Sequence, residues 1–446
     1  MSSTDRDPQQ PDAPQVDPVL LRGLTMPRLS RLSRRDVLRM AGVGGAAVGA
    51  GALLSACSVG GQGTQSAGGT GSTGAGGATS SASAQDAVQA YWADKKKTGQ
   101  LTWANWPLYI DTAGKGKHPS LDQFEKQSGI KVAYREDIQD NPSFFAKIRP
   151  TLQAGQYTGY DLAVISDGQV LTRLMALGYL VPLDHSQLPN FAKYAGAKYK
   201  DPDYDPGNRY TIPWQAGFSG LAYNPDKVGR EITSYEDLLD PKFKGKIGMF
   251  GDAGELGNAA MFALGIDAVH STEADWKKAA AWLEKVKPNV RKYYEQDYVQ
   301  SLVNGDIWVT QAWSGDIFQS NLSGSNLKFV IPKEGGLLWT DNFLILKYAK
   351  HPVDALMLMD YYYQPKVAAE VAEWVNYVTP VPKAQQVVLH EASKAKGKDA
   401  KDLRQLAHSY AVFPTPKTYA TVSTGRTLKL DEIDTFNSIF EPIFQS

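Results

Sequence analysis

The chain has 446 residues and equal numbers of basic and acidic side chains, 47 Lys or Arg and 47 Asp or Glu. A formal charge of zero argues against nucleic acid as a partner, because phosphate binding requires a basic excess. The six histidines are scattered, and the single cysteine, Cys57, permits neither an internal disulfide nor a thiolate metal cluster, so we expect no metal site and no cofactor.

The first 56 residues have the layout of an export signal. Arg34 and Arg35 stand shortly before the uncharged run 40–56, which is rich in small and apolar residues. This run is a poor permanent membrane span, which takes about 20 strongly apolar residues. The arginine pair resembles the twin-arginine signal, which exports proteins that are already folded.

Cys57 follows Leu54, Ser55 and Ala56 in a pattern that resembles the bacterial lipobox, where the cysteine begins the mature chain and carries a lipid. The alternative is a buried core cysteine. Residues 58–84 contain no charge and consist mostly of Gly, Ser, Thr, Ala and Gln, which is typical of a flexible coil. We therefore expect 57–100 to be a lipidated cysteine and linker that anchor an extracytoplasmic body to the outer face of the cell membrane, in the periplasm or at the cell surface.

From residue 101 onward, predicted strands and helices alternate. In chain order the pattern predicts a strand at 101–106, a helix at 121–128, strands at 130–134 and 161–165, a helix at 170–177, a strand at 246–250, and helices from about 257, at 276–286 and at 353–363. Gly129 and Gly178 end the first two helices. The alternation predicts an α/β fold with largely parallel sheets, and the chain length predicts two domains.

Known catalytic motifs are missing from the sequence. It contains no Gly-x-Ser-x-Gly elbow and no His-Glu-x-x-His, and the Gly-Lys-Gly-Lys run at 114–117 lacks the upstream glycine of a phosphate loop. We therefore expect that the protein is not an enzyme.

Aromatic residues beside carboxylates, in predicted loops, are the unusual feature of the sequence. The aromatic–carboxylate pairs are Trp313 with Asp316 and Trp339 with Asp341; further rings stand at Trp106, Tyr109 and Tyr377, and two more carboxylates at Asp252 and Glu255. Such residues suit an elongated organic cation, because methylenes pack between rings and carboxylates pair with ammonium groups.

Other interpretations of these residues remain open. Asp252 and Glu255 could simply cap a helix, and tryptophans and tyrosines are more often part of a core than of a ligand site. Asp252 and Glu255 could also be the acid and base of a secreted glycosidase, whose carboxylates must flank the scissile bond. A structural envelope lipoprotein that binds no small molecule is a third possibility.

The order of motifs from about 101 to 384 resembles the spermidine/putrescine-binding proteins of bacterial ABC importers. The matching landmarks are Asn-Trp-Pro-Leu-Tyr at 105–109, Gly-Ile-Lys-Val at 129–132, Tyr-Asp-Leu-Ala-Val-Ile-Ser at 160–166, Ile-Pro-Trp at 212–214, Lys-Gly-Lys at 244–246, Asp-Ala-Gly-Glu at 252–255, Pro-Lys-Glu-Gly-Gly at 332–336, Trp-Thr-Asp at 339–341 and Tyr-Val-Thr-Pro at 377–380. The resemblance implies an α/β fold of the periplasmic-binding-protein type, with two lobes that close on a ligand by hinge motion. It implies a first lobe of 101–218 plus 340–384 and a second lobe of 219–339 plus 385–446, with crossings near 215–220, 340 and 385.

The resemblance also implies a set of ligand-binding residues: Trp106, Tyr109, Ser166, Asp252, Glu255, Trp313, Asp316, Trp339, Asp341 and Tyr377. Asp341 matches the central carboxylate of polyamine binders, and Asp316 resembles the second aspartate of putrescine-type members. Pro107, Leu108 and Gly168 depart from the pattern of the family, which leaves the length of the ligand open.

The implied function is that of a monomeric receptor, which captures putrescine or spermidine and delivers it to the permease subunits of an ABC importer. The same fold could instead bind thiamine or another organic cation, an amino-acid derivative or a sugar. The cluster of carboxylates argues against sugars and anions.

Overall fold

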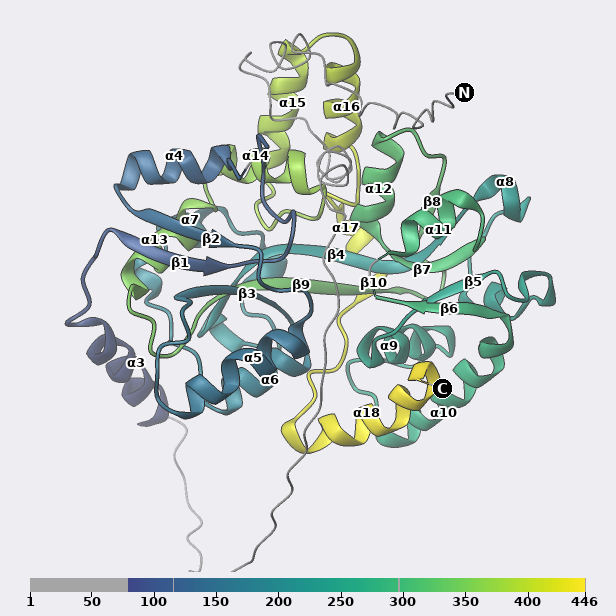
Figure 1. Cartoon of the computed structure of the whole chain (residues 1–446), viewed down its shortest axis with the longest axis horizontal. Coiled ribbons are helices and arrows are strands. Elements are labelled where there is room, and N and C mark those ends of the chain that lie inside the picture. Colours follow the sequence, from purple (N-terminus) through teal and green to yellow (C-terminus); the bar gives the residue numbers. More distant parts are fainter. Residues whose placement is uncertain (1–78, 115, 296, 446) are drawn as a thin grey trace, which may run out of the picture.

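The computed structural model describes residues 79–114, 116–295 and 297–445 (Figure 1). The predicted export signal, Cys57 and residues 58–78 of the predicted linker lie outside these residues. No helix in the described part of the chain is both long enough and apolar enough to span a bilayer.

All described strands belong to one mixed sheet. Its main path runs β2-β1-β3-β9-β4-β7-β5-β6, with β10 paired to β9 and β8 paired to β4. The strands are β1 (Gln100–Ala104), β2 (Lys131–Arg135), β3 (Leu162–Ser166), β4 (Thr211–Tyr223), β5 (Ile247–Phe250), β6 (Val290–Tyr294), β7 (Val309–Trp313), β8 (Lys328–Val330), β9 (Gly336–Ile345) and β10 (Val422–Ser423).

The two central strands, β4 and β9, join the two halves of the molecule, and we call them the hinge strands. They pair antiparallel from Thr211↔Leu344 to Ser219↔Leu337, with a register shift between Pro213 and Gln215. On one side β1, β2 and β3 are parallel to one another, and on the other side β5, β6 and β7 are parallel. The prediction of parallel sheets is therefore confirmed within each half. It is wrong at the centre, because the two hinge strands run in opposite directions and pair antiparallel with β3 and β7.

Helices cover both faces of the sheet in each half (Figure 1). The first lobe, built on β1, β2 and β3, carries α3 (Thr79–Trp92), α4 (Pro119–Ser128), α5 (Asn141–Gln153), α6 (Gln169–Ala176), α7 (Pro189–Tyr194), α13 (Pro352–Tyr361) and α14 (Pro365–Val375). The second lobe, built on β5, β6 and β7, carries α8 (Pro225–Val228), α9 (Ala253–Ala263), α10 (Glu273–Val286), α11 (Tyr298–Asn304), α12 (Ser314–Leu322) and α18 (Leu430–Gln445). The remaining helices are α15 (Ala384–Lys394), α16 (Gly397–Ala407) and α17 (Pro416–Tyr419), and short 3-10 turns lie at His185–Gln187, Ala197–Tyr199, Pro206–Asn208, Tyr235–Leu239, Pro241–Phe243 and Lys287–Asn289.

Alternating strand residues build a separate core on each face of the sheet. In β1, Trp103 belongs to a hydrophobic cluster with residues of α4, α13 and α14. Its neighbour Ala104 belongs to another hydrophobic cluster, with residues of α5 and α6. In the second lobe, Met249 packs with α9, α10 and α18, and the next residue, Phe250, packs with α11 and α12. This alternation is what a strand buried on both faces requires, and it confirms the predicted α/β fold with three layers in each lobe.

The helix ends show how local sequence sets the boundaries. Gly129 ends α4 with a φ of 69°, as predicted, because a residue without a side chain adopts this left-handed conformation at no cost. The helix that was predicted from about 257 begins earlier, at Ala253, because the Asp252 side chain caps it.

Two segments pack differently from the expected domain boundaries. The predicted linker does not extend to residue 100: the buried Trp92 of α3 donates a hydrogen bond from its indole N–H to the Pro182 carbonyl over 2.8 Å. Residues 385–413, expected in the second lobe, contribute Val388, Leu403 and Val412 to the core of the first lobe. The final crossing therefore comes after residue 413 and leads to α18, which packs in the core of the second lobe.

Candidate functional site

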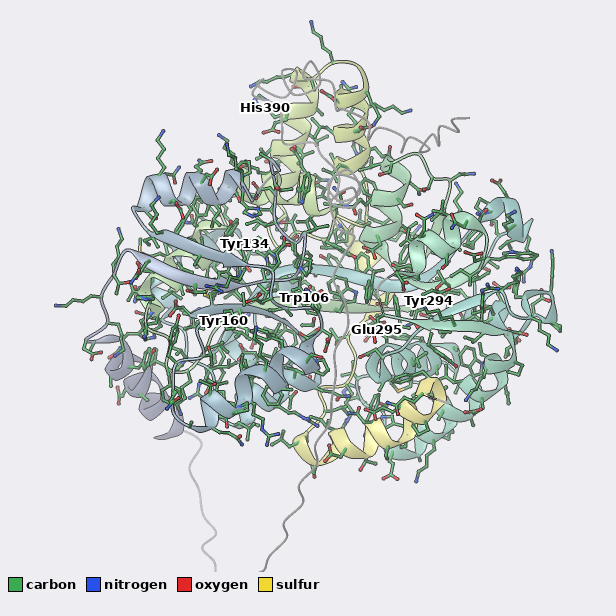
Figure 2. All side chains as sticks on the ribbon, viewed as in Figure 1. Trp106, Tyr134, Tyr160, Tyr294, Glu295 and His390 are labelled. Carbon is green, nitrogen blue, oxygen red and sulfur yellow. The ribbon has the colours of Figure 1, made fainter. Side chains whose placement is uncertain are left out.

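A cavity of about 1230 Å³ lies between the lobes and is lined by both of them and by the hinge strands. All ten residues in the predicted ligand-binding set line it: Trp106, Tyr109, Ser166, Asp252, Glu255, Trp313, Asp316, Trp339, Asp341 and Tyr377. In Figure 2, Trp106 is labelled near the centre of the view, with Tyr294 and Glu295, two further lining residues, on the side of the second lobe. Segments that are far apart in the sequence thus converge on one space.

Asp341 lies on a hinge strand and is nearly fully buried, with 6% of its surface exposed. The Tyr109 hydroxyl donates to Asp341 Oδ2 over 2.7 Å, and the Ser166 hydroxyl donates to Oδ1 over 2.6 Å. The Asn141 amide in turn donates to the Ser166 hydroxyl over 3.0 Å. Neutral donors therefore orient this carboxylate without neutralising its charge.

Asp316, in the first turn of α12, is held in the same way. The Tyr377 hydroxyl donates to its Oδ1 over 2.6 Å, and the Tyr298 hydroxyl donates to its Oδ2 over 3.0 Å. Tyr298 also accepts the backbone N–H of Trp313, which places the tyrosine at the junction of β7 and α12. The second aspartate thus shares with the first the pattern of two hydroxyl donors.

Glu255, on α9, is the third carboxylate held by neutral groups. Its Oε1 accepts the Trp313 indole N–H over 2.9 Å and the Ser219 hydroxyl over 2.8 Å, and Oε2 accepts the Gln311 amide over 3.2 Å. Burial raises the pKa of Glu255 to about 7, and Asp252 nearby adds to the rise, although the three donors oppose it.

Asp252 combines a capping role with a place in the cavity wall. Its Oδ1 accepts the backbone N–H of Glu255 over 2.8 Å, so the capping interpretation is confirmed for this residue. Desolvation by the surrounding protein raises the pKa of Asp252. The cap fixes the first turn of α9 and thereby the backbone position of Glu255.

The predicted aromatic residues form the walls between these carboxylates. The Trp313 ring stacks on Phe250 at 4.5 Å, and the Trp339 ring meets Tyr377 at 5.3 Å with an interplanar angle of 63°. The Trp106 indole N–H donates to the Val164 carbonyl over 3.1 Å. Each ring is therefore fixed by its neighbours before any ligand arrives.

Two glycines make room for two of these rings. A Cβ added at Gly217 would lie 2.3 Å from the Trp339 ring, and one added at Gly315 would lie 2.6 Å from the Tyr377 ring. Both distances are well below van der Waals contact, so the ring positions depend on the absence of side chains at these two residues.

The structure also brings Asp167 into the cavity wall, a residue that the sequence interpretation missed. Its Oδ1 accepts the backbone N–H of Thr340 over 3.0 Å, and its own N–H donates to the Thr340 carbonyl over 2.7 Å. Desolvation, with added repulsion from Asp341 and Glu255, raises the pKa of Asp167 to about 8. Its position directly after Ser166, at the end of β3, is the only signal that could have identified it.

Basic residues also line the cavity, and the described contacts engage two of them elsewhere. Arg426 pairs with Glu432 at 2.7 Å, and the Lys200 ammonium donates to the Ala192 carbonyl over 2.6 Å. Lys198 is exposed. The inner wall is therefore formed by carboxylates, hydroxyls and aromatic rings, an arrangement that can bind an organic cation without help from a metal ion or cofactor of its own.

Comparisons with known proteins agree with this geometry. A family model described as bacterial extracellular solute-binding protein matches residues 120–402. The spermidine/putrescine-binding periplasmic protein of Escherichia coli is 31% identical over 310 residues, covering 69% of this chain and 85% of that protein. The putrescine-binding periplasmic protein PotF of the same organism is 32% identical over 319 residues, covering 66% and 81%.

A solved structure of a similar protein has a similar fold. A structure from Listeria monocytogenes, provisionally named a spermidine/putrescine ABC transporter, superposes with a TM-score of 0.65 at 27% identity. It covers 78% of this chain and 99% of that one. The predicted resemblance and the two-lobed fold are thereby confirmed.

Proposed function

The chain belongs to the bacterial extracellular solute-binding protein family, and from this premise we propose that it captures a polyamine, putrescine or spermidine, between its lobes and delivers it to the permease of an ABC importer. The observation that carries the proposal is the set of carboxylates held by neutral donors in an aromatic-lined cavity. In this function the chain catalyses no reaction and needs no cofactor, and ATP hydrolysis belongs to the partner subunits.

Each part of the cavity has a role in binding a polyamine. Asp341 and Asp316 hold one ammonium group, while Glu255 and Asp252 receive the other end of the ligand. Trp106, Tyr109, Trp313, Trp339 and Tyr377 pack on the methylenes and supply cation–π contacts worth about 0.5–2 kcal/mol each. Removing water from an ammonium group costs several kcal/mol, and a preoriented carboxylate at each end offsets that cost.

The same proposal places the protein on the outer face of the cell membrane. A twin-arginine signal at Arg34 and Arg35 exports the folded chain, and a lipid on Cys57 retains a monomer at the surface; all three residues lie outside the described part of the chain. Metabolic labelling with a radioactive fatty acid tests the anchor. The wild type incorporates label and fractionates with membranes, whereas Cys57→Ser does neither; label retained in Cys57→Ser contradicts the anchor.

Ligand-dependent unfolding tests the binding function. The purified protein is melted with putrescine, cadaverine, spermidine, spermine, thiamine, arginine and maltose. A ligand at 100 times its dissociation constant stabilises the folded state by about 2.7 kcal/mol, so polyamines raise Tm by several degrees and maltose leaves it unchanged. Folded, ligand-free protein that responds to thiamine and to no polyamine would exclude the proposed ligand. Turnover of chromogenic glycosides would exclude a purely binding role.

A further inference from the structure

Asp167 is a cavity carboxylate with one oxygen engaged and one open. The two hydrogen bonds with Thr340 fix its backbone and its Oδ1 against hinge strand β9. Its Oδ2 accepts no hydrogen bond from a described residue. At the adjacent Gly168, an added Cβ would meet no atom within 4 Å, so the space beside this carboxylate is open.

Two other elements each contribute a carboxylate that acts on Asp167 through space. Asp341 on the hinge strand and Glu255 on α9 of the second lobe both act on it by electrostatic repulsion. The nearby Tyr204 hydroxyl donates to Asn342 over 2.9 Å, and from α18 the neutral Asn437 lines the same cavity. Within the described residues, no Lys or Arg makes an ion pair with Asp167 or Glu255. A desolvated carboxylate in these surroundings needs a positive charge that the protein itself does not provide.

We propose that Asp167 is a specificity-determining residue that binds the central ammonium group of a triamine, so that the cavity prefers a triamine to a diamine. The inference rests on the proposed function and deepens it. Asp167 directly follows Ser166, whose hydroxyl donates to Asp341, and it lines the same cavity as Glu255. In the proposed function, Asp341 and Glu255 bind opposite ends of the ligand. A diamine satisfies those two positions and leaves Asp167 to retain a proton, whereas a triamine brings a third charge that replaces the proton.

Calorimetry with spermidine and putrescine tests this role in the purified protein. Asp167→Asn keeps the shape of the side chain and removes its charge, so the affinity for spermidine falls at least tenfold and the affinity for putrescine at most threefold. The matched control is Asp203→Asn, which removes one charge from an exposed residue at the same cavity and leaves both affinities unchanged.

The number of protons released on binding gives a second measurement. A purely structural role of Asp167 would not change this number. Titration at pH 7.5 in buffers of different ionisation enthalpy counts the protons released when spermidine binds. The wild type releases more protons with spermidine than with putrescine, and Asp167→Asn removes the difference. Equal losses of affinity for both ligands, or no loss, overturn the role of Asp167 and leave the proposed function standing. A wild-type protein that binds neither polyamine overturns both.

Discussion

The Tyr109 hydroxyl lies 2.7 Å from Asp341 Oδ2 and joins two residues that are 232 positions apart in the chain. Tyr109 follows the first strand of the first lobe, and Asp341 lies on a hinge strand that pairs with both β3 and β4. A buried carboxylate held by hydroxyl donors keeps its charge available, since no cation of the protein is needed to orient it.

Removing that charge should abolish most of the binding. In Asp341→Asn the side chain keeps its size, but a ligand ammonium loses its charged partner, and we expect a loss of about 2–5 kcal/mol in binding free energy. Isothermal titration calorimetry with putrescine and spermidine measures it, and the unfolding temperature verifies that the variant is folded. Unchanged affinity for both ligands would show that Asp341 does not contact them.

The Trp339 ring depends on Gly217, which is paired with it across the hinge strands. In Gly217→Ala the new methyl would lie 2.3 Å from the ring, so the ring must move; overpacking of this kind costs about 1–3 kcal/mol. We expect a lower Tm, a shifted tryptophan emission and weaker polyamine binding. The control is Gly251→Ala, whose Cβ would have its nearest neighbour at an ordinary 3.7 Å. If Gly217→Ala is as stable as Gly251→Ala and binds polyamines as tightly, the tight fit between Gly217 and the Trp339 ring is contradicted.

Glu255 makes opposite contributions to stability and to binding as pH changes. Its pKa is raised from 4.5 to about 7 in the folded state, so folding takes up a proton and this group destabilises the fold as pH rises from about 4.5 to 7. Cation binding needs the ionised form and should therefore strengthen over the same range. Glu255→Gln removes both effects.

Melting curves from pH 5 to pH 8 test this opposition. The Tm of Glu255→Gln minus that of the wild type should increase with pH, while the polyamine-induced shift in Tm becomes smaller at every pH. A Tm difference that is constant with pH would contradict a raised pKa at Glu255.

A reciprocal amide pair connects the lobes between α6 and α18. The Gln169 amide donates to Asn437 Oδ1 over 2.7 Å, and the Asn437 amide donates back to Gln169 Oε1 over 3.1 Å. Unfolding of Gln169→Ala, Asn437→Ala and the double variant should give a coupling energy of about 0.5–1.5 kcal/mol. Ser438→Ala, the exposed neighbour on α18, should show no coupling with Gln169→Ala. A coupling energy near zero for the first pair would mean that the lobes are not held together there.

The sequence was most informative where a local rule sets the structure. Gly129 ends its helix as predicted because the left-handed conformation favours glycine, and the short apolar run at 161–165 predicts β3 to within one residue. The ten predicted site residues line one cavity because the resemblance carried their three-dimensional arrangement, which periodicity alone does not contain.

Long-range packing limited the rest of the prediction. An apolar stripe on α15 or α16 shows that a helix has a buried face, but it does not show which lobe covers that face, and residues 384–413 pack on the first lobe. In the same way, Asp167 reads as an ordinary turn residue after a strand. Its importance comes from Thr340, Asp341 and Glu255, which are 88 or more positions away.

Because Asp341 lies on a hinge strand, a ligand that binds there would sit close to the axis about which the lobes could rotate. In any rotation of the lobes about β4 and β9, an atom moves further the more distant it is from the axis. An ammonium group at Asp341 would therefore move little. The carboxylates of Glu255 and Asp252, on α9 of the second lobe, lie off that strand pair and travel further. A monoamine that reaches only Asp341 would occupy the cavity without drawing the lobes together. If the proposed site is correct, lobe closure would depend on the length of the cation, and a permease that engages only the closed arrangement would receive only cations long enough to reach α9 from Asp341.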